Sequence, residues 1–262
     1  MIRLSCASLS AEGFQDSGFE KTFSMIPAAG FKYIELNLWF GRMILPKTIE
    51  SIKSRCYRQG VEISSIYCTF LGGNPDRLDV DVAHKLYCMD IALQLGCRRL
   101  VMGGVPADSA GSLDAAIEVL KLIGPPAEEK DLAICLENHH QCTIETTEHY
   151  ATILDAVPSG NIGICIDTGH FDASAVDMDD LIDRFGPRIN HFHIKDNRNR
   201  GKKDFCLIGD GTTDNLRLLQ RLRNVGYEGF AVVEQSPPGG RAVNVDDLKL
   251  IYQMFAGFDE QG

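Results

Sequence analysis

Short apolar runs rich in β-forming residues alternate along the chain with longer stretches that have helical periodicity. In six places a helical stretch ends near a glycine and a strand-like run follows within a few residues, as in residues 58–67 (RQGVEISSIY) and 158–167 (PSGNIGICID). Between these runs, apolar residues return every three or four positions, as at Leu86, Met89 and Leu93, which is the spacing of one helix face. With an initial run counted, the pattern predicts eight strands, starting near residues 2, 32, 61, 98, 132, 161, 189 and 230.

The intervals between the predicted strands suit a parallel sheet. Each is 28 to 41 residues long, which is enough for a strand, a crossover helix and two loops. Ser112 and Thr213 are expected to cap helices, and Pro46 fits the first turn of another. Eight strands alternating with eight helices predict a single domain over residues 1–262, a (β/α)8 TIM barrel of the α/β class. An open, doubly wound sheet is the alternative fold.

Four residues with metal-binding side chains stand at the ends of consecutive strand-like runs. Three are carboxylates and one is an imidazole, and the carboxyl ends of parallel barrel strands open onto one face of the molecule. Any one of them alone would be more typical of a helix cap or a hydrogen-bonded core residue. Together they predict a site for one divalent metal ion, with the ligands Glu137, Asp167, His193 and Glu234.

The ligand types favour a hard cation. Carboxylate oxygens with one imidazole suit Mn²⁺, Mg²⁺ or Co²⁺ better than a closed, thiolate-rich zinc site, and Zn²⁺ stays as an alternative. Coordination positions left open would let a substrate approach the cation. A cation that holds vicinal oxygens polarises a carbonyl and stabilises the enediolate that forms when an adjacent C–H proton leaves.

Five motifs resemble the xylose isomerase-like TIM-barrel superfamily: CLENHH (135–140), CIDTGH (165–170), HFHIKDNR (191–198), LIGDGTTD (207–214) and GYEGFAVVEQ (226–235). The resemblance follows strand order over essentially the whole chain. It implies metal-dependent chemistry on a small sugar or keto-sugar, as in ketose 3-epimerases, hydroxypyruvate isomerases and inosose dehydratases. We therefore expect a sugar isomerase or epimerase that works by proton transfer through an enediolate. The resemblance also implies a homo-oligomer, a dimer or a tetramer.

The same resemblance gives roles to individual residues. It implies that Glu137 and Glu234 hold the metal and also act as a catalytic acid/base pair on opposite faces of the substrate. It implies that His170 hydrogen-bonds a substrate oxygen or orients a neighbouring group. Arg198 or Arg200 is expected to match the arginine that the epimerases place after the seventh strand.

Other functions stay open at this point. Lys195, in the sequence HIKD, departs from the epimerase pattern and is more similar to inosose dehydratases, so it is a further substrate-binding candidate. Expulsion of water from the same enolate would make the enzyme a lyase. A barrel that binds a metabolite without turnover is less favoured, since it needs no acid/base pair. An AP endonuclease-like hydrolase is also less favoured, because the second to fourth strands end without the histidines for its additional metals.

Several further residues are expected near the substrate. Glu35 ends the second strand and either reaches the substrate or forms a salt bridge at the rim. Trp39 and Phe40 follow it, in a loop where aromatic faces often wall a sugar pocket, with plain packing as the alternative. Only one of His139 and His140 can point inward, and His139 is the candidate. His191 lies two residues before the predicted ligand of the seventh strand, so it is expected in the layer beneath.

Two loops near the predicted site are glycine-rich. Gly209-Asp210-Gly211 precedes a helix, and we expect it to shape the chain there rather than bind an anion, because Asp210 would repel a phosphate. Residues 237–241 (PPGGR) are expected to form a lid or rim loop after the eighth strand.

Bulk composition narrows the partners. The formal net charge of −10 disfavours sequence-independent binding to nucleic acid, which needs clustered basic residues. No apolar run approaches the ~20 residues needed to span a bilayer, and the first residues do not resemble a signal peptide. The nine cysteines include no CxxC pair, and several lie in apolar runs, which favours reduced core thiols. We expect a cytoplasmic protein with neither a nucleic-acid nor a membrane partner.

Overall fold

The computed structural model describes residues 1–109, 111–236 and 242–259, so the predicted lid at residues 237–241 lies outside the described residues. Eight strands form a closed barrel in chain order, and each strand pairs in parallel with its neighbours. The strands start within one residue of the predicted positions, so the (β/α)8 prediction is confirmed and the open sheet is wrong. Their bounds are β1 Arg3–Ala7, β2 Tyr33–Asn37, β3 Glu62–Phe70, β4 Arg99–Gly103, β5 Ala133–Glu137, β6 Ile162–Asp167, β7 Ile189–Ile194 and β8 Phe230–Val233.

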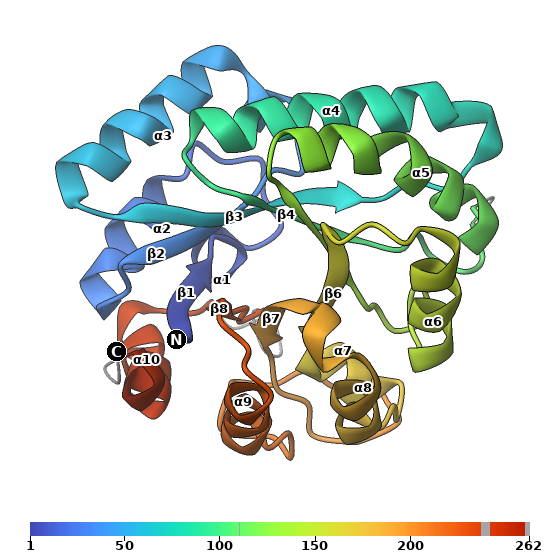
Figure 1. The fold of residues 1–262 in the computed structure, drawn as a ribbon. Helices are drawn as coiled ribbons and strands as arrows, with labels where there is room; N and C mark the ends of the chain where they lie inside the picture. Colours follow the sequence, from blue (N-terminus) through green and yellow to red (C-terminus); the bar gives the residue numbers. More distant parts are fainter. Residues whose placement is uncertain (110, 237–241, 260–262) are drawn as a thin grey trace.

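Seven helices form an outer layer around the barrel (Figure 1): α3 Pro46–Gln59, α4 Leu78–Gln94, α5 Leu113–Glu129, α6 Thr147–Ala156, α8 Met178–Phe185, α9 Asn215–Asn224 and α10 Val245–Asp259. Among the described residues, no helix is both long and apolar enough to cross a membrane. The remaining helical segments are short, and they are α1 Leu9–Glu12, α2 Glu20–Met25, α7 Thr168–Ala173 and the 3-10 turns η1 Pro27–Ala29, η2 Gly41–Ile44, η3 Pro75–Arg77 and η4 Gly186–Arg188. The β6–β7 connection therefore contains two α-helices, α7 and α8, where the sequence pattern predicted one.

Two of the three predicted helix-start signals are confirmed. Pro46 is the first residue of α3, and the Ser112 hydroxyl accepts a hydrogen bond from the backbone N–H of Ala115 at the start of α5. The prediction for Thr213 is wrong, because the cap of α9 is Asp214, whose carboxylate accepts from the N–H of Arg217. The Thr213 N–H instead donates to Asp196, which holds this residue in the preceding turn.

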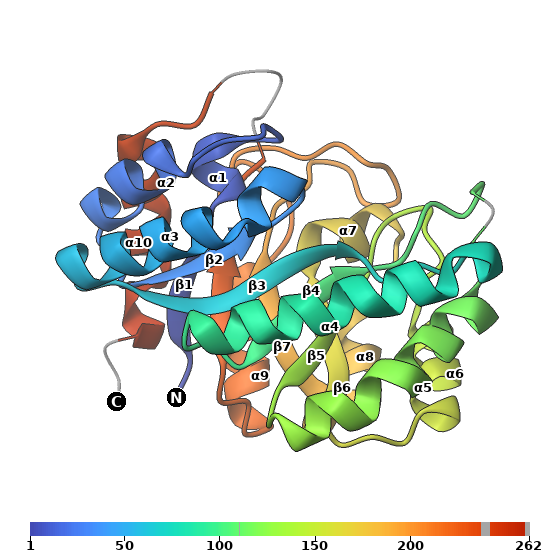
Figure 2. The ribbon, with the colours of Figure 1, turned by 90° about the horizontal axis from the view of Figure 1, so that it is seen from above.

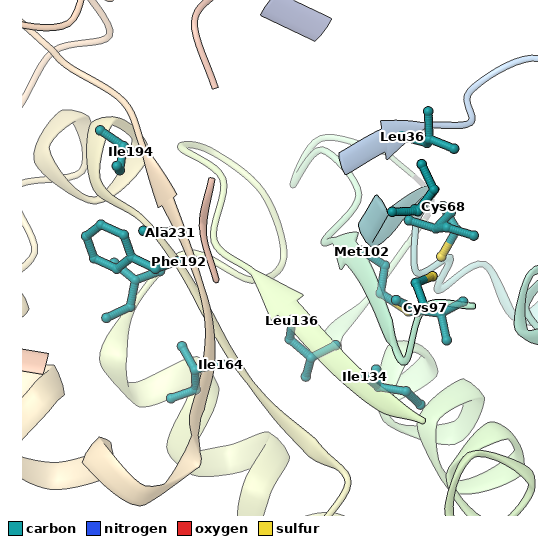
Figure 3. Close-up of a cluster of buried hydrophobic side chains, with 14 of the residues drawn as sticks. Leu36, Cys68, Cys97, Met102, Ile134, Leu136, Ile164, Phe192, Ile194 and Ala231 are labelled. Carbon is teal, nitrogen blue, oxygen red and sulfur yellow. The ribbon is translucent and has the colours of Figure 1, made fainter. Parts of the chain in front are cut away.

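The side chains of the strands divide between two interiors. One set packs against the outer helices in the main hydrophobic core, part of which Figure 3 shows around Leu136, Ile164 and Phe192. The alternate set faces the barrel axis, as expected for a period of two. There Cys135 and Cys165 pack in a small cluster of their own. All nine cysteines are free thiols and eight are buried, so their predicted role as core residues is confirmed.

Strand register brings the ends of β5 to β8 to one level. Glu137 pairs with Cys165 on β6, and Asp167 pairs with His193 on β7. Beyond β8, the Glu234 N–H donates to Ile194 of β7 at 3.0 Å. These ends lie on the side of the barrel that carries α1 and α7, opposite the N terminus (Figure 2). The four predicted ligands therefore lie side by side at the carboxyl ends of neighbouring strands.

Candidate active site

The four predicted metal ligands converge at the carboxyl end of the barrel. Donor atoms of Glu137, Asp167, His193 and Glu234 all lie within 4.8 Å of one another, and all four side chains are buried. Donors on opposite sides of a divalent cation stand about 4 to 5 Å apart, given ligand distances of roughly 2.0–2.6 Å. The side chains are therefore spaced as a single coordination sphere requires.

His193 presents a different nitrogen to each side. Its Nδ1 lies 2.5 Å from Glu137 Oε1 and 2.9 Å from Glu234 Oε2. Its Nε2 lies 3.2 Å from a Glu35 oxygen on the other side. The ring is thus oriented with Nδ1 toward the carboxylate cluster, where a ligand nitrogen is needed.

Asp167 has two functions in the structure. Its Oδ1 accepts from the N–H of His170 at 2.8 Å and so caps α7. Its Oδ2 faces the cluster, 2.9 Å from Lys195 Nζ. The Asn138 side chain bonds both the backbone N–H and the C=O of Asp167, at 2.8 and 3.1 Å. Asp167 therefore caps α7 with one oxygen and presents the other to the cluster. Asn138, which belongs to the sequence motif ENHH, holds the backbone of Asp167 in place.

Lys195 places a buried positive charge beside two of the predicted ligands. Its Nζ lies 2.7 Å from Glu234 Oε1 and 2.9 Å from Asp167 Oδ2. Burial acts to lower the pKa of Lys195, but Asp167 and Glu234 outweigh burial and raise the pKa above its ordinary value. The side chain therefore stays an ammonium near neutral pH.

The carboxylates crowd one another strongly enough to shift their titration. Burial raises the pKa of Glu137 to about 7, with Glu234 and Asp167 adding to the rise and His193 opposing it. Burial also raises the pKa of Asp167, against the opposing charge of Lys195. For Glu234, burial is outweighed by Lys195 and His193, so its pKa lies below the ordinary value. A divalent cation at this point would relieve the repulsion.

The chemistry of the donors fits a divalent cation. One buried oxygen of each carboxylate, Glu137 Oε2, Asp167 Oδ2 and Glu234 Oε2, has no aligned hydrogen bond. Nitrogen atoms of neighbouring side chains lie 2.9 to 3.3 Å from these oxygens but at poor hydrogen-bonding angles. Buried carboxylate oxygens are costly to leave unpaired. Three such oxygens and one imidazole nitrogen aimed at a common point form a set that a hard divalent cation would satisfy.

Glu35 lies beneath this cluster, and it does not line the cavity that opens above it. Its side chain is fully buried, and Oε2 lies 2.9 Å from His191 Nε2 and 2.7 Å from the Ser65 hydroxyl. Burial would raise the pKa of Glu35, but His193 and His191 outweigh burial and bring it to about 2. Of the two alternatives for Glu35, the position at the cavity is corrected, because its inward place on β2 is one layer too deep. The ionic contact is present, but with His191 and His193 inside the barrel rather than at the rim. His191 lies in that lower layer, as its position on the strand predicted.

A cavity of about 640 Å³ opens above the cluster. Of the predicted substrate-binding residues, it brings together Trp39, His139, His170 and Lys195, and Glu234 also lines it. Its walls include aromatic residues that the sequence interpretation did not single out, namely Phe14, Tyr67, Phe70 and Phe205. Tyr67 is the last residue of the strand-like run at residues 58–67, so its place near the carboxyl end of the third strand was a usable signal. The other three depend on how strand-end loops fold over the barrel.

The histidines after β5 and β6 form a connected group. The His139 ring lies 4.2 Å from the His170 ring, and the backbone N–H of His140 donates to His170 Nδ1 at 3.1 Å. Burial lowers the pKa of His170 well below its ordinary value. The ring is therefore neutral, with Nδ1 accepting and the proton on Nε2, which is the donor left for a ligand. The His140 side chain turns away to Glu145 and Ser174, so His139 is the inward member of the pair.

Neither predicted arginine lines the cavity. Arg198 lies beside Asp204 at 3.6 Å, and Arg200 bonds the carbonyl oxygens of Ala175 and Val176. The expectation for Arg198 is therefore corrected, because the β7–α9 connection turns its side chain toward that connection's own acidic residue. The cationic residues of this connection that do line the cavity are Lys195 and Lys203.

The glycine turn before α9 has the structural role that was predicted. The N–H groups of Gly209 and Gly211 donate to Asp196 Oδ2 at 2.9 and 3.0 Å. A Cβ at Gly211 would lie 2.1 Å from Asp196 Oδ1, so a side chain does not fit there. The backbone donors of this turn are occupied by an internal carboxylate rather than available to an anion.

Comparison with known proteins identifies the family of the chain. The sequence profile of the xylose isomerase-like TIM barrel family matches residues 23–253. The chain belongs to this family. Inosose dehydratase of Clostridium perfringens (strain 13 / Type A) is 23% identical over 255 residues, which cover 84% of this chain and 83% of that protein. D-psicose 3-epimerase of Enterocloster bolteae is 27% identical over 157 residues, which cover 59% of this chain and 50% of that protein.

Solved structures show the same fold. A crystal structure described as the IOLI protein with a binding zinc atom superposes with a TM-score of 0.79 at 18% identity, covering 99% of both chains. The family relatives named above are enzymes, a dehydratase and an epimerase. The chain thus shares its fold and family with enzymes that act on small sugar-like molecules.

Proposed function

We propose that this chain is a divalent-metal-dependent sugar isomerase or epimerase that moves a proton at the carbon beside a carbonyl. The observation that carries the proposal is the convergence of Glu137, Asp167, His193 and Glu234 within 4.8 Å at the buried end of a ligand-sized cavity. The similarity to a dehydratase and to an epimerase supports it, since both reactions can begin by removing a proton beside a carbonyl.

Glu137 and Glu234 are the proposed acid/base pair. One carboxylate takes the C–H proton, the bonding electrons form a C=C bond, and the carbonyl oxygen becomes an oxyanion. The second carboxylate returns a proton to carbon, on the opposite face for an epimerase or at the neighbouring carbon for an isomerase. Both glutamates lie within 3 Å of His193 Nδ1, so they flank one small volume.

The other residues bind and orient. A divalent cation, which we propose to be Mn²⁺, Mg²⁺ or Co²⁺ with Zn²⁺ as the alternative, supplies positive charge beside the developing oxyanion. Asp167 and His193 complete its ligand set. The Nε2–H of His170 donates to a substrate oxygen, and the Lys195 ammonium adds a second positive charge to the cavity floor. Trp39 and His139 bound the space above.

A dehydratase is the second candidate, and Lys195 is the observation that favours it. Its buried ammonium lies 2.7 Å from Glu234, so the site holds a positive charge and a hydrogen-bond donor that can stabilise a departing hydroxyl group, while a glutamate of the acid/base pair supplies the proton. If the carbon next to the enolate bears a hydroxyl, the electron pair can expel it, and protonation releases it as water. This is the chemistry of an inosose dehydratase-like lyase acting on a keto-sugar or keto-cyclitol.

Incubation in D₂O separates the two functions and tests both. The Mn²⁺-loaded protein is given a panel of ketoses, keto-sugars and inososes, and the products are followed by NMR and mass spectrometry. Deuterium incorporated at the carbon beside the carbonyl, in a product that has lost no water, supports the isomerase or epimerase. Loss of one water from a substrate supports the lyase. Absence of both across the panel contradicts the proposal.

A further inference from the structure

The cavity above the metal-ligand cluster has mostly aromatic walls. Three of the phenylalanines around its mouth, Phe14, Phe40 and Phe70, are 67%, 38% and 44% exposed. Exposed apolar side chains gathered at one opening are typical of a ligand-binding groove. The polar residues lie deeper, where Glu234 and Lys195 form the floor. The cavity is therefore polar at the reacting end and aromatic toward solvent.

One aromatic wall follows β1, β2 and β3. The Phe14 ring stacks on the Trp39 ring at 4.9 Å with an interplanar angle of 12°. Trp39 in turn meets Tyr67 edge to face, with ring centroids 6.3 Å apart. These contacts hold the rings in fixed orientations before any ligand arrives, which lowers the entropy cost of stacking a ligand against them.

The other wall follows β5, β6 and β7. His170 contacts Phe205 edge to face at 4.8 Å, and Lys203 Nζ lies 5.5 Å from the Phe205 ring. In a closed ring of eight strands, the ends of β2 and β6 stand on opposite sides. Trp39 and the Phe205–His170 pair thus flank the cavity from opposite sides.

A simple sugar matches only the floor of this cavity. Its hydroxyl groups need hydrogen-bond partners when they are buried, and unpaired hydroxyls are costly. In the outer part, the described lining residues offer mainly ring carbons, and the polar side chains there are Thr69, Ser236, Lys203 and the two histidines His139 and His170. The volume of about 640 Å³ is that of a pocket for a drug-sized ligand rather than for one sugar ring.

We infer that the substrate is a keto-sugar that carries an aromatic substituent, with its vicinal oxygens at the cluster floor and its aromatic ring between the two walls. The inference rests on the proposed function for the reacting end and adds the class of the substituent. Stacked and edge-to-face contacts with the rings of the two walls would hold the substituent.

Trp39 is the only tryptophan of the chain, so its fluorescence reports on this cavity directly. The Mg²⁺-loaded protein is titrated with phenyl β-D-glucoside and with methyl β-D-glucoside, and calorimetry repeats both titrations. We expect the phenyl glycoside to bind at least about tenfold more tightly, because it buries a ring that the methyl glycoside lacks. Equal affinities, including no measurable binding of either glycoside, would overturn the inference.

Ring-removing variants test the walls. Phe14→Leu and Phe70→Leu keep an apolar side chain, and both sites are exposed enough to spare the fold. Each substitution should lower the affinity for the phenyl glycoside about two- to tenfold and leave the affinity for the methyl glycoside unchanged. Tyr57→Leu, at a ring on α3 that is 91% exposed and outside the cavity lining, is the matched control and should change neither. An equal loss for both glycosides in Phe14→Leu and Phe70→Leu would contradict a specific role for the rings.

The D₂O experiment keeps this inference apart from the proposed function. If unsubstituted ketoses exchange deuterium but the phenyl glycoside binds no more tightly than the methyl glycoside, the inference of an aromatic substituent is rejected and the proposed function stands. If the phenyl glycoside binds more tightly but no carbonyl sugar, including phenyl-substituted ones, exchanges deuterium or loses water, the proposed function is rejected and the inference about the substituent stands.

Discussion

Glu35 lies 3.2 Å from the Nε2 of His193, the ring nitrogen that faces away from the carboxylate cluster. A metal-binding histidine that donates its other N–H to a carboxylate is held in one tautomer and one orientation. Glu35 is therefore a positioning residue for the proposed metal site. Burial opposes the ionisation of Glu35, but His193 and its second histidine partner, His191, outweigh burial, lower its pKa and keep it ionised.

The first prediction follows from this contact. Glu35→Gln should lower the affinity for Mn²⁺ about 10- to 100-fold, because the neutral amide no longer fixes the imidazole, while the circular dichroism spectrum stays unchanged. Calorimetric titration with Mn²⁺ measures the effect. Glu62→Gln, at an exposed glutamate on β3, is the control and should bind as the unaltered protein does. Equal affinity in Glu35→Gln would show that His193 needs no such support.

The second prediction concerns the acid/base pair. Glu234→Gln keeps an oxygen ligand but removes the proton-transfer group, so kcat should fall about 10²- to 10⁴-fold while metal content falls far less. Turnover in the D₂O assay and metal analysis after dialysis check both parts. Asp167→Asn is the comparison, because it alters a ligand that has no proposed proton-transfer role. Unchanged turnover in Glu234→Gln would remove this residue from the mechanism.

The third prediction is the pH dependence of cation binding. In the metal-free protein the pKa of Glu137 is raised to about 7, and acidic neighbours outweigh burial to raise the pKa of His193 well above its ordinary value. Both groups must lose a proton to become ligands, so protons compete with the cation. Apparent affinity should rise with pH, and its dependence on pH should be steeper below pH 7, where Glu137 also releases a proton. Calorimetry in buffers of different ionisation enthalpy counts these protons, and a pH-independent affinity would contradict the assignment.

The fourth prediction concerns the stability of the part of β3 that supports the cavity wall. Thr69 interrupts β3 with a φ of 68°, and the ladder to β4 shifts register between Tyr67 and Phe70. The buried Lys85 ammonium donates to the carbonyl oxygens of Cys68 and Phe70, at 2.9 and 2.5 Å. Lys85→Met would leave those carbonyl groups without their donor, at a cost of about 2 kcal/mol in the free energy of unfolding.

Urea denaturation measures the loss in Lys85→Met. Lys53→Met, which removes a half-exposed lysine from a surface ion pair on α3, is the control and should change stability by less than about 0.5 kcal/mol. Similar effects of the two substitutions would show that the β3 bulge does not depend on Lys85. Because the bulge carries Tyr67 and Phe70 into the cavity wall, the experiment also probes what holds that wall in place.

The barrel and its ligand set could be predicted because both follow from local periodicity. Strand-like runs, six of them shortly after a glycine, marked all eight strands, and the carboxyl ends of parallel strands meet at one rim whatever the loops do. Side chains alternate between the two faces of a strand, so the position of Glu137 or Asp167 along its strand was enough to predict that it points inward. The same alternation predicted that His191 lies one layer lower, but it did not predict how far Glu35 lies below the cavity.

The tertiary structure alone decided what surrounds those ligands. Arg198 turns to Asp204, Phe205 reaches His170, and Lys195 lies between two carboxylates, because loops several residues long can place a side chain in many directions that local sequence does not distinguish. The sequence by itself determined the barrel, its reacting rim and the four converging ligands. The three-dimensional packing of the strand-end loops determined the aromatic walls, the internal ammonium and the layer that holds His193, since these depend on contacts between residues far apart in the chain.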